Sequence, residues 1–409
     1  MISNLTTMTE SAPRQKRMAT EVNSGINGLI AACNKNDRFR LLEDDSVLPS
    51  NLDNPVHSVF SGLSCKGPMK QMLQLASHFL THDTVLTFFV PLLYGRELAS
   101  VAGDTCKTYL SDPLAKSSTE KHKTYLSGVR EALSCLSHSV LFKFQPPAKR
   151  VYARTLLDNA RPCHDPLCCP AFQRRYSSKI ELANCFRNYY ASGEYASASR
   201  CAQFRHDFLL AITLVHEIVH AVGVLLRGNL NEPHIRADCP ETEWGYGWEH
   251  FMFGSVINPQ DRTGTGTHLL MRKVWADQKT AEVTGGKEYS DVPMAYIAQW
   301  FRKETWDIIR SQGPTAIAAP VAHFKIQSSN KLGAWVVLSD DPAIKKDLVK
   351  LRARWKGCAK IPSLVQSSSP TPNGRVRCSK IMWKPVSTRQ LQKDNVAIPA
   401  RMQQVPRLS

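Results

Sequence analysis

Two histidines and a glutamate interrupt the most apolar stretch of this 409-residue chain. Between Phe208 and Leu226 the only titratable side chains are His216, Glu217 and His220, in the segment LVHEIVHAVG. Burying such groups costs free energy unless a partner satisfies them. Because residues four apart lie one turn apart on the same helical face, both imidazoles can meet one metal ion.

This HExxH spacing is typical of a zinc site. Zinc binds imidazole nitrogens and lowers the pKa of a bound water towards neutrality, and Glu217 can take up the proton as a general base. The alternative is a pair of core histidines bonded to the backbone or to each other. That arrangement would leave an ionised glutamate in the same buried turn. The pattern therefore predicts zinc ligands at His216 and His220, with Glu217 as the catalytic residue.

A catalytic zinc needs a third protein ligand and an open position. The metzincin pattern has a histidine at the position of Leu226, so here the third ligand must come from elsewhere. An acidic and aromatic segment, residues 231–254, follows the motif. If ETEWGYGWEHFMF within it is helical, Glu243 and Glu249 lie roughly 120° apart around the axis, and only one of them can face the ion.

We prefer Glu249 as the third ligand, with Glu243 as the alternative. Trp248, Phe251 and Phe253 flank Glu249 and would bury it against the motif helix, whereas Glu243 could be a first-turn charge that the helix dipole favours. The outside candidates are Glu232, His234 and His250.

These residues resemble a sequence-defined group of fungal zincin-like proteins of the HExxH, gluzincin type. In that group HExxHA is followed by EP and then by ExGxxWE, with a phenylalanine and a glycine after it. The resemblance covers roughly residues 199–306. The matching residues are His216, Glu217, His220, Ala221, Glu232, Pro233, Glu243, Gly245, Trp248, Glu249, Phe253 and Gly254. It implies a zincin-type metallopeptidase fold with a glutamate as third ligand, and it implies no substrate.

The elements that position the motif follow from apolar periodicity. Residues 199–227 are predicted to form one long buried helix, with Gly228 as its cap. The same patterns predict helices at residues 68–80, 118–136 and 291–313, and short strands at residues 139–145, 151–157 and 179–186. The predicted fold class is α+β and zincin-like, mostly helical, with a small sheet and a central HExxH helix.

Composition and charge divide the chain. With 43% hydrophobic residues it can bury a substantial core. Residues 341–409 contain 15 Lys/Arg and 3 Asp/Glu, which gives +12 of the net charge of +17. We therefore expect a polar, disordered segment at residues 1–50, a zincin-like domain at 51–320, closed by the predicted helix at 291–313, and a basic, partly disordered extension at 321–409.

The sequence also gives expectations about compartment and partners. No secretory signal or membrane span is recognised, and the twelve cysteines lack a disulfide-framework spacing. We expect an intracellular protein, cytoplasmic or nuclear, with no membrane association. The basic tail is either a solvated segment or an electrostatic handle for nucleic acid or another acidic partner.

The predicted function is that of a zinc-dependent metallopeptidase acting on a peptide or protein substrate. One alternative is a SprT-like, DNA-associated protease that uses the basic tail for recruitment. The other is a zincin scaffold that binds zinc but does not cleave. An intact Glu217 argues against the scaffold.

Overall fold

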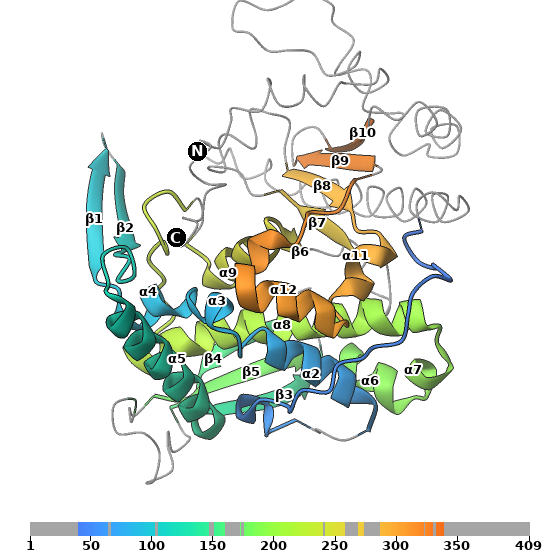
Figure 1. The fold of residues 1–409 in the computed structure, drawn as a ribbon, viewed down its shortest axis with the longest axis horizontal. Helices are drawn as coiled ribbons and strands as arrows, with labels where there is room; N and C mark the ends of the chain where they lie inside the picture. The colour runs from blue at the N-terminus through green and yellow to red at the C-terminus, as the bar shows by residue number, and fades with distance from the viewer. Residues whose placement is uncertain are drawn as a thin grey trace, which may run out of the picture.

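Helices and small sheets surround one long apolar helix in the computed structural model (Figure 1). The structure describes residues 40–63, 67–102, 105–146, 151–159, 172, 176–239, 242–257, 269–273, 287–322, 324–329 and 333–338. The fold is mixed α/β. The basic residues 341–409 and most of the N-terminal segment, on which expectations were stated above, lie outside the described residues.

The long helix is α8, Arg200–Arg227, and the prediction for this segment is confirmed. Ser199 caps its start, since the side-chain oxygen accepts a hydrogen bond from Ala202 N at 3.1 Å. Gly228 ends it with φ +68°, a left-handed conformation that glycine adopts without strain. By length and composition α8 is apolar enough to cross a membrane, but 78% of its most apolar window is buried inside the protein. The core helix of a soluble protein passes the same test.

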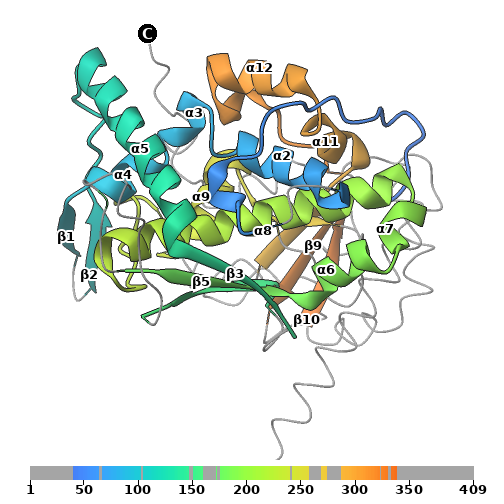
Figure 2. The ribbon, with the colours of Figure 1, turned by 90° about the horizontal axis from the view of Figure 1, so that it is seen from below.

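A three-stranded sheet covers one side of α8, and helices cover the other (Figure 2). The sheet has the order β3-β5-β4, with β3 parallel and β4 antiparallel to β5. Its strands are β3 (Val140–Gln145), β4 (Ala153–Leu157) and β5 (Ser178–Ala183). The covering helices include α2 (Lys70–His78) and α5 (Thr119–Ser139). This small sheet and both helices are as predicted.

A β-hairpin that was not predicted projects from the same end of the fold as α5 (Figure 1). It consists of β1 (Glu97–Ala102) and β2 (Thr105–Leu110), which pair antiparallel. The shorter helices of the N-terminal half are α3 (Asp83–Leu86), α4 (Phe89–Tyr94), α6 (Asn184–Ala191) and α7 (Glu194–Ser197), with 3-10 turns at Ser58–Phe60 and Gly67–Met69.

The segment after α8 contains α9 (Trp244–Phe253) and an antiparallel sheet of order β10-β9-β8-β7-β6. The strands are β6 (Val256–Ile257), β7 (Leu270–Arg272), β8 (Lys287–Asp291), β9 (Phe324–Ser329) and β10 (Gly333–Leu338). A 3-10 turn at Pro314–Ala316 precedes β9. The last two strands pair within this sheet, so the folded region continues past the boundary expected at residue 320.

The single helix predicted at residues 291–313 is wrong, because the chain forms two helices, α11 (Met294–Gln299) and α12 (Lys303–Gln312). Arg302 between them is extended, with φ −117° and ψ 131°. Asn51 stabilises the break: its side-chain oxygen accepts from Lys303 N at 2.8 Å, and its backbone N donates to Phe301 O at 3.2 Å. The break also lets the Phe301 ring stack on Phe204 of α8, with centroids 4.2 Å apart.

A buried histidine pair joins α2 to α12. His78 Nδ1 lies 3.0 Å from His82 Nε2, and both rings stack on Trp306, with centroids 4.6 and 5.6 Å away. The pKa of His78 is lowered to about 3, mainly by burial and to a smaller extent by the neighbouring His82 and Arg310. Burial and then Arg310 lower the pKa of His82 to about 4. Both imidazoles are therefore neutral in the folded protein at neutral pH.

We expect acid to destabilise the protein through this pair. The folded pKa values lie below the unfolded value of about 6.5, so the unfolded state binds more protons as pH falls below 6.5. The free energy of unfolding should drop by about 2 kcal/mol per histidine between pH 7 and pH 5. Urea unfolding of chelator-treated protein measures this drop. It should be smaller in His78→Gln and His82→Gln, and an unchanged pH slope in both variants would contradict the assignment.

Candidate metal centre

The start of α9 places Glu243 against both motif histidines. Glu243 is the N-cap of α9, and its Oε2 accepts from Tyr246 N. Its Oε1 lies 2.9 Å from His216 Nε2 and 2.7 Å from His220 Nε2. Glu243 is therefore not a first-turn residue, as weighed in the sequence: one carboxylate oxygen caps the helix, and the other faces the histidines.

His216, His220 and Glu243 form the one group of three or more potential metal ligands found among the described residues. One ligand atom of each lies within 4.8 Å of the other two. A tetrahedral zinc with bonds of about 2.0 Å holds its ligand atoms about 3.3 Å apart, so Glu243 Oε1 would need to move only about half an ångström away from each Nε2 atom. The donor set and its spacing fit a zinc ion.

Glu249, the preferred third ligand from the sequence, lies on the other nitrogen of His216. Its Oε1 is 2.7 Å from His216 Nδ1, and its Oε2 accepts from Ile257 N of β6 at 2.6 Å. The structure thus reverses the preference and places Glu243, not Glu249, at the Nε2 atoms. The two glutamates do not lie on one helix, as the 120° separation requires, because α9 begins at Trp244 and Glu243 precedes it as the N-cap.

Glu232 lies on Nδ1 of His220, as Glu249 lies on Nδ1 of His216. Its Oε1 lies 2.6 Å from His220 Nδ1, and its Oε2 accepts from Trp244 N at 2.8 Å. A carboxylate on Nδ1 fixes the tautomer and orientation of a metal-binding histidine and raises the basicity of Nε2. Both motif histidines have this partner. The structure does not bring the other outside candidates, His234 and His250, into the ligand group.

A glycine permits the close approach of α9 to α8. A Cβ at Gly245 would lie 2.4 Å from His216 Nε2, closer than atoms can pack. The next residue, Tyr246, has its ring centroid 5.2 Å from that of His216, edge to face. On its other side, the Arg272 guanidinium of β7 lies 4.6 Å from the Tyr246 ring centroid. The C-terminal sheet therefore supports the site through Arg272 as well as through Ile257.

Glu217, the predicted general base, is buried, with 5% of its surface exposed. Its Oε2 accepts a hydrogen bond from Thr155 Oγ1 at 2.7 Å, and the same hydroxyl lies 3.1 Å from Glu217 O. Thr155 belongs to β4, one of the two edge strands of the small sheet within the described residues. Sequence reasoning missed Thr155, because nothing in ARTLL marks it as a site residue.

The side chains of the candidate ligands are only partly buried. The side chains of His216 and His220 are 14% and 12% exposed, and that of Glu243 is 33% exposed. A structural zinc site is closed by four protein ligands, whereas a catalytic site keeps an open position. Three candidate ligands with partial exposure correspond to the open type.

The charges in the site are strongly coupled. Burial lowers the pKa of His220, but Glu232 and Glu243 outweigh burial and raise this pKa to about 9. Burial likewise disfavours the charged form of His216. Glu243 and Glu249 nevertheless raise the pKa of His216 well above its ordinary value. Burial disfavours the charged form of Glu243, yet the two histidines hold its pKa well below the usual range. A metal ion would therefore compete with protons for the two Nε2 atoms.

Comparisons of the chain with protein-family models, with curated proteins and with solved structures gave no match.

Proposed function

We propose that this protein is a zinc-dependent metallopeptidase with a zincin-like fold. His216, His220 and Glu243 would hold the ion, and Glu217 would act as general base. The observation that carries the proposal is the convergence of the two Nε2 atoms and Glu243 Oε1 on one partly exposed point, with each Nδ1 held by its own carboxylate. Zinc bound there would supply Lewis-acid chemistry and acidify water.

Glu217 would take up the proton, and Thr155 would orient Glu217. Glu217 adjoins His216 in the motif, so its carboxylate is available to hold the proton that water loses. The Thr155 hydroxyl occupies Oε2 of Glu217 and fixes the carboxylate, which leaves Oε1 as the oxygen that we assign to the proton. Ferrous iron also accepts two histidines and a carboxylate, but the buried Glu217 favours hydrolysis and hence zinc.

The neighbouring sheet favours an extended peptide as substrate. In the described residues β4 pairs with β5 alone, so its other edge offers backbone hydrogen-bonding groups. A peptide that adds to such an edge forms main-chain hydrogen bonds of the β type. Because Thr155 of β4 contacts Glu217, the peptide would pass beside the general base.

The full-length protein tests the proposal directly. We expect about one zinc per chain by elemental analysis, and cleavage of a peptide library that a chelator abolishes and added zinc restores. His216→Ala should lose the zinc. Iron in place of zinc, or cleavage that survives chelation, would refute the proposal. The SprT-like alternative stays a prediction that depends on the tail, and it requires DNA to stimulate cleavage of a DNA-bound protein.

A further inference from the structure

The β1–β2 hairpin is hydrogen-bonded to the segment that joins α8 to α9. Residues 229–239 follow α8 and Gly228 directly, and we call them the ligand loop. They contain Glu232, the partner of His220 Nδ1, and precede Glu243, the proposed third ligand. His234 forms a parallel bridge with Tyr109 of β2. Its N donates to Thr108 O at 2.9 Å, and its O accepts from Leu110 N at 2.8 Å. The middle of the ligand loop thus extends the hairpin as a short third strand.

Lys107 of β2 holds the end of the ligand loop. Its Nζ donates to Ala237 O at 2.6 Å and to Cys239 O at 2.7 Å. An ammonium group can make three such bonds, and charge-assisted hydrogen bonds are roughly twice as strong as neutral ones. Cys239 lies four residues before Glu243, so Lys107 fixes the backbone shortly before the third ligand.

The hairpin also contacts the two helices that carry the site. Glu97 at the start of β1 pairs with Arg227, the last residue of α8. The Arg227 guanidinium in turn lies 5.2 Å from the ring centroid of Trp244, the first residue of α9. Trp244 is the residue whose N binds Glu232. The described contacts of the hairpin are therefore distributed along the connection that runs from the end of α8 to Cys239, four residues before Glu243.

We propose that Lys107 is a positioning residue of the metal centre, which sets the ligand loop so that Glu232 and Glu243 reach the two histidines. This inference rests on the proposed zinc site. Lys107 touches none of the ligand atoms, and residues 96–100 of the hairpin are exposed to solvent. Its loss should therefore affect the arrangement of the ligands more than the stability of the core.

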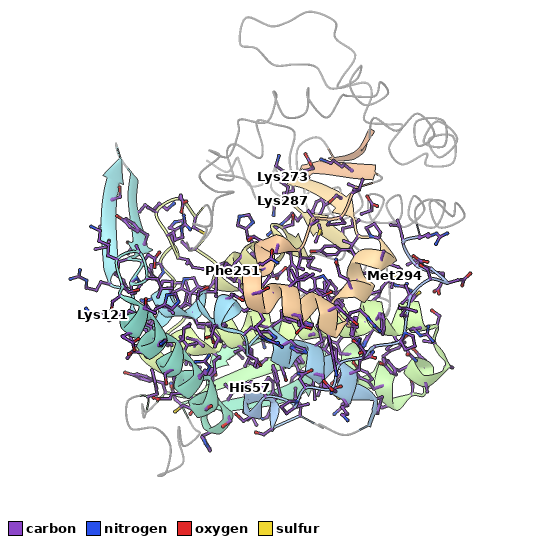
Figure 3. All side chains as sticks on the ribbon, viewed as in Figure 1. His57, Lys121, Phe251, Lys273, Lys287 and Met294 are labelled. Carbon is purple, nitrogen blue, oxygen red and sulfur yellow. The ribbon has the colours of Figure 1, made fainter. Side chains whose placement is uncertain are left out.

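The test compares zinc affinity in full-length variants by competition with a chromophoric chelator. Lys107→Met should bind zinc about tenfold more weakly, at the lower end of the range of about 10–100-fold for outer-shell partners. Lys107→Arg keeps a cationic donor and should recover most of the affinity. Lys121→Met removes an exposed lysine of α5 (Figure 3) and should match the wild type. The thermal midpoint of the metal-free protein should be the same in all four.

Each other outcome has a definite meaning. If the wild type binds zinc and Lys107→Met binds it equally tightly, the role of Lys107 is overturned and the proposed function stands. If Lys107→Met lowers the metal-free thermal midpoint and Lys107→Arg restores neither property, Lys107 is a general stabilising residue and the inference is again overturned. If the wild type binds no zinc, the proposed function fails, and the inference fails with it.

Discussion

Glu217→Gln is expected to retain zinc and to lose hydrolysis by a factor of about 10²–10⁴, the usual worth of general acid–base catalysis. The amide cannot hold the proton that water must lose. It can still accept from Thr155 Oγ1 through its oxygen, so the fold and the metal affinity should be kept. The measurement is the rate of peptide-library cleavage by variant and wild type at equal zinc content.

The control for losing one carboxylate is Glu120→Gln, which changes an exposed residue of α5 and should cleave at the wild-type rate. Unchanged cleavage by Glu217→Gln would exclude the proposed mechanism. Zinc binding without cleavage by either protein, over a broad set of substrates, would instead favour the zincin scaffold that binds metal and does not react.

The second prediction with a large expected effect is a loss of zinc affinity on changing Glu243, the proposed third ligand. Glu243→Gln should weaken zinc binding by about 10²–10³-fold, since a total of about 10–16 kcal/mol is shared among a few ligands and an amide is a poor ligand for zinc. Its amide oxygen can still accept from Tyr246 N, so the N-cap of α9 should persist. The comparison is with Glu249→Gln, measured by chelator competition on the same preparation.

Glu249→Gln should weaken binding less, by about 10–100-fold, because Glu249 supports His216 from its Nδ1 side. The change also leaves the bond from Ile257 N available to the amide oxygen. If Glu249→Gln proves the more harmful of the two, the third ligand is Glu249 and the arrangement at the start of α9 changes on metal binding.

The sequence predicts the parts of this protein whose signals are local. The caps at Ser199 and Gly228 and the apolar run between them define α8 without reference to any other segment. The spacing of His216 and His220 places their imidazoles together for the same reason. Helices α2 and α5 and the small sheet are also visible, because their apolar positions recur with the period of their structure.

Features that depend on distant residues were missed. The break between α11 and α12 requires Asn51, which is some 250 residues away in sequence and caps the second helix. The choice between Glu243 and Glu249 depends on where α9 starts, and Glu232 binds the first amide of that helix. Strands such as KEYSD and FKIQSS show no alternation strong enough to predict a five-stranded sheet.

The hydrogen bond from Ile257 N to Glu249 limits how early the candidate centre can form while the chain is being synthesised. The residues of α8 are synthesised before Glu243, and His216 gains its Nδ1 partner only once Glu249 and the Ile257 amide have followed. Before Glu243 is added, Glu217 already adjoins the two histidines, but the carboxylate that faces both Nε2 atoms is missing. If the proposed function is correct, a nascent chain would gain the complete centre, and with it hydrolysis, only after β6 has been translated.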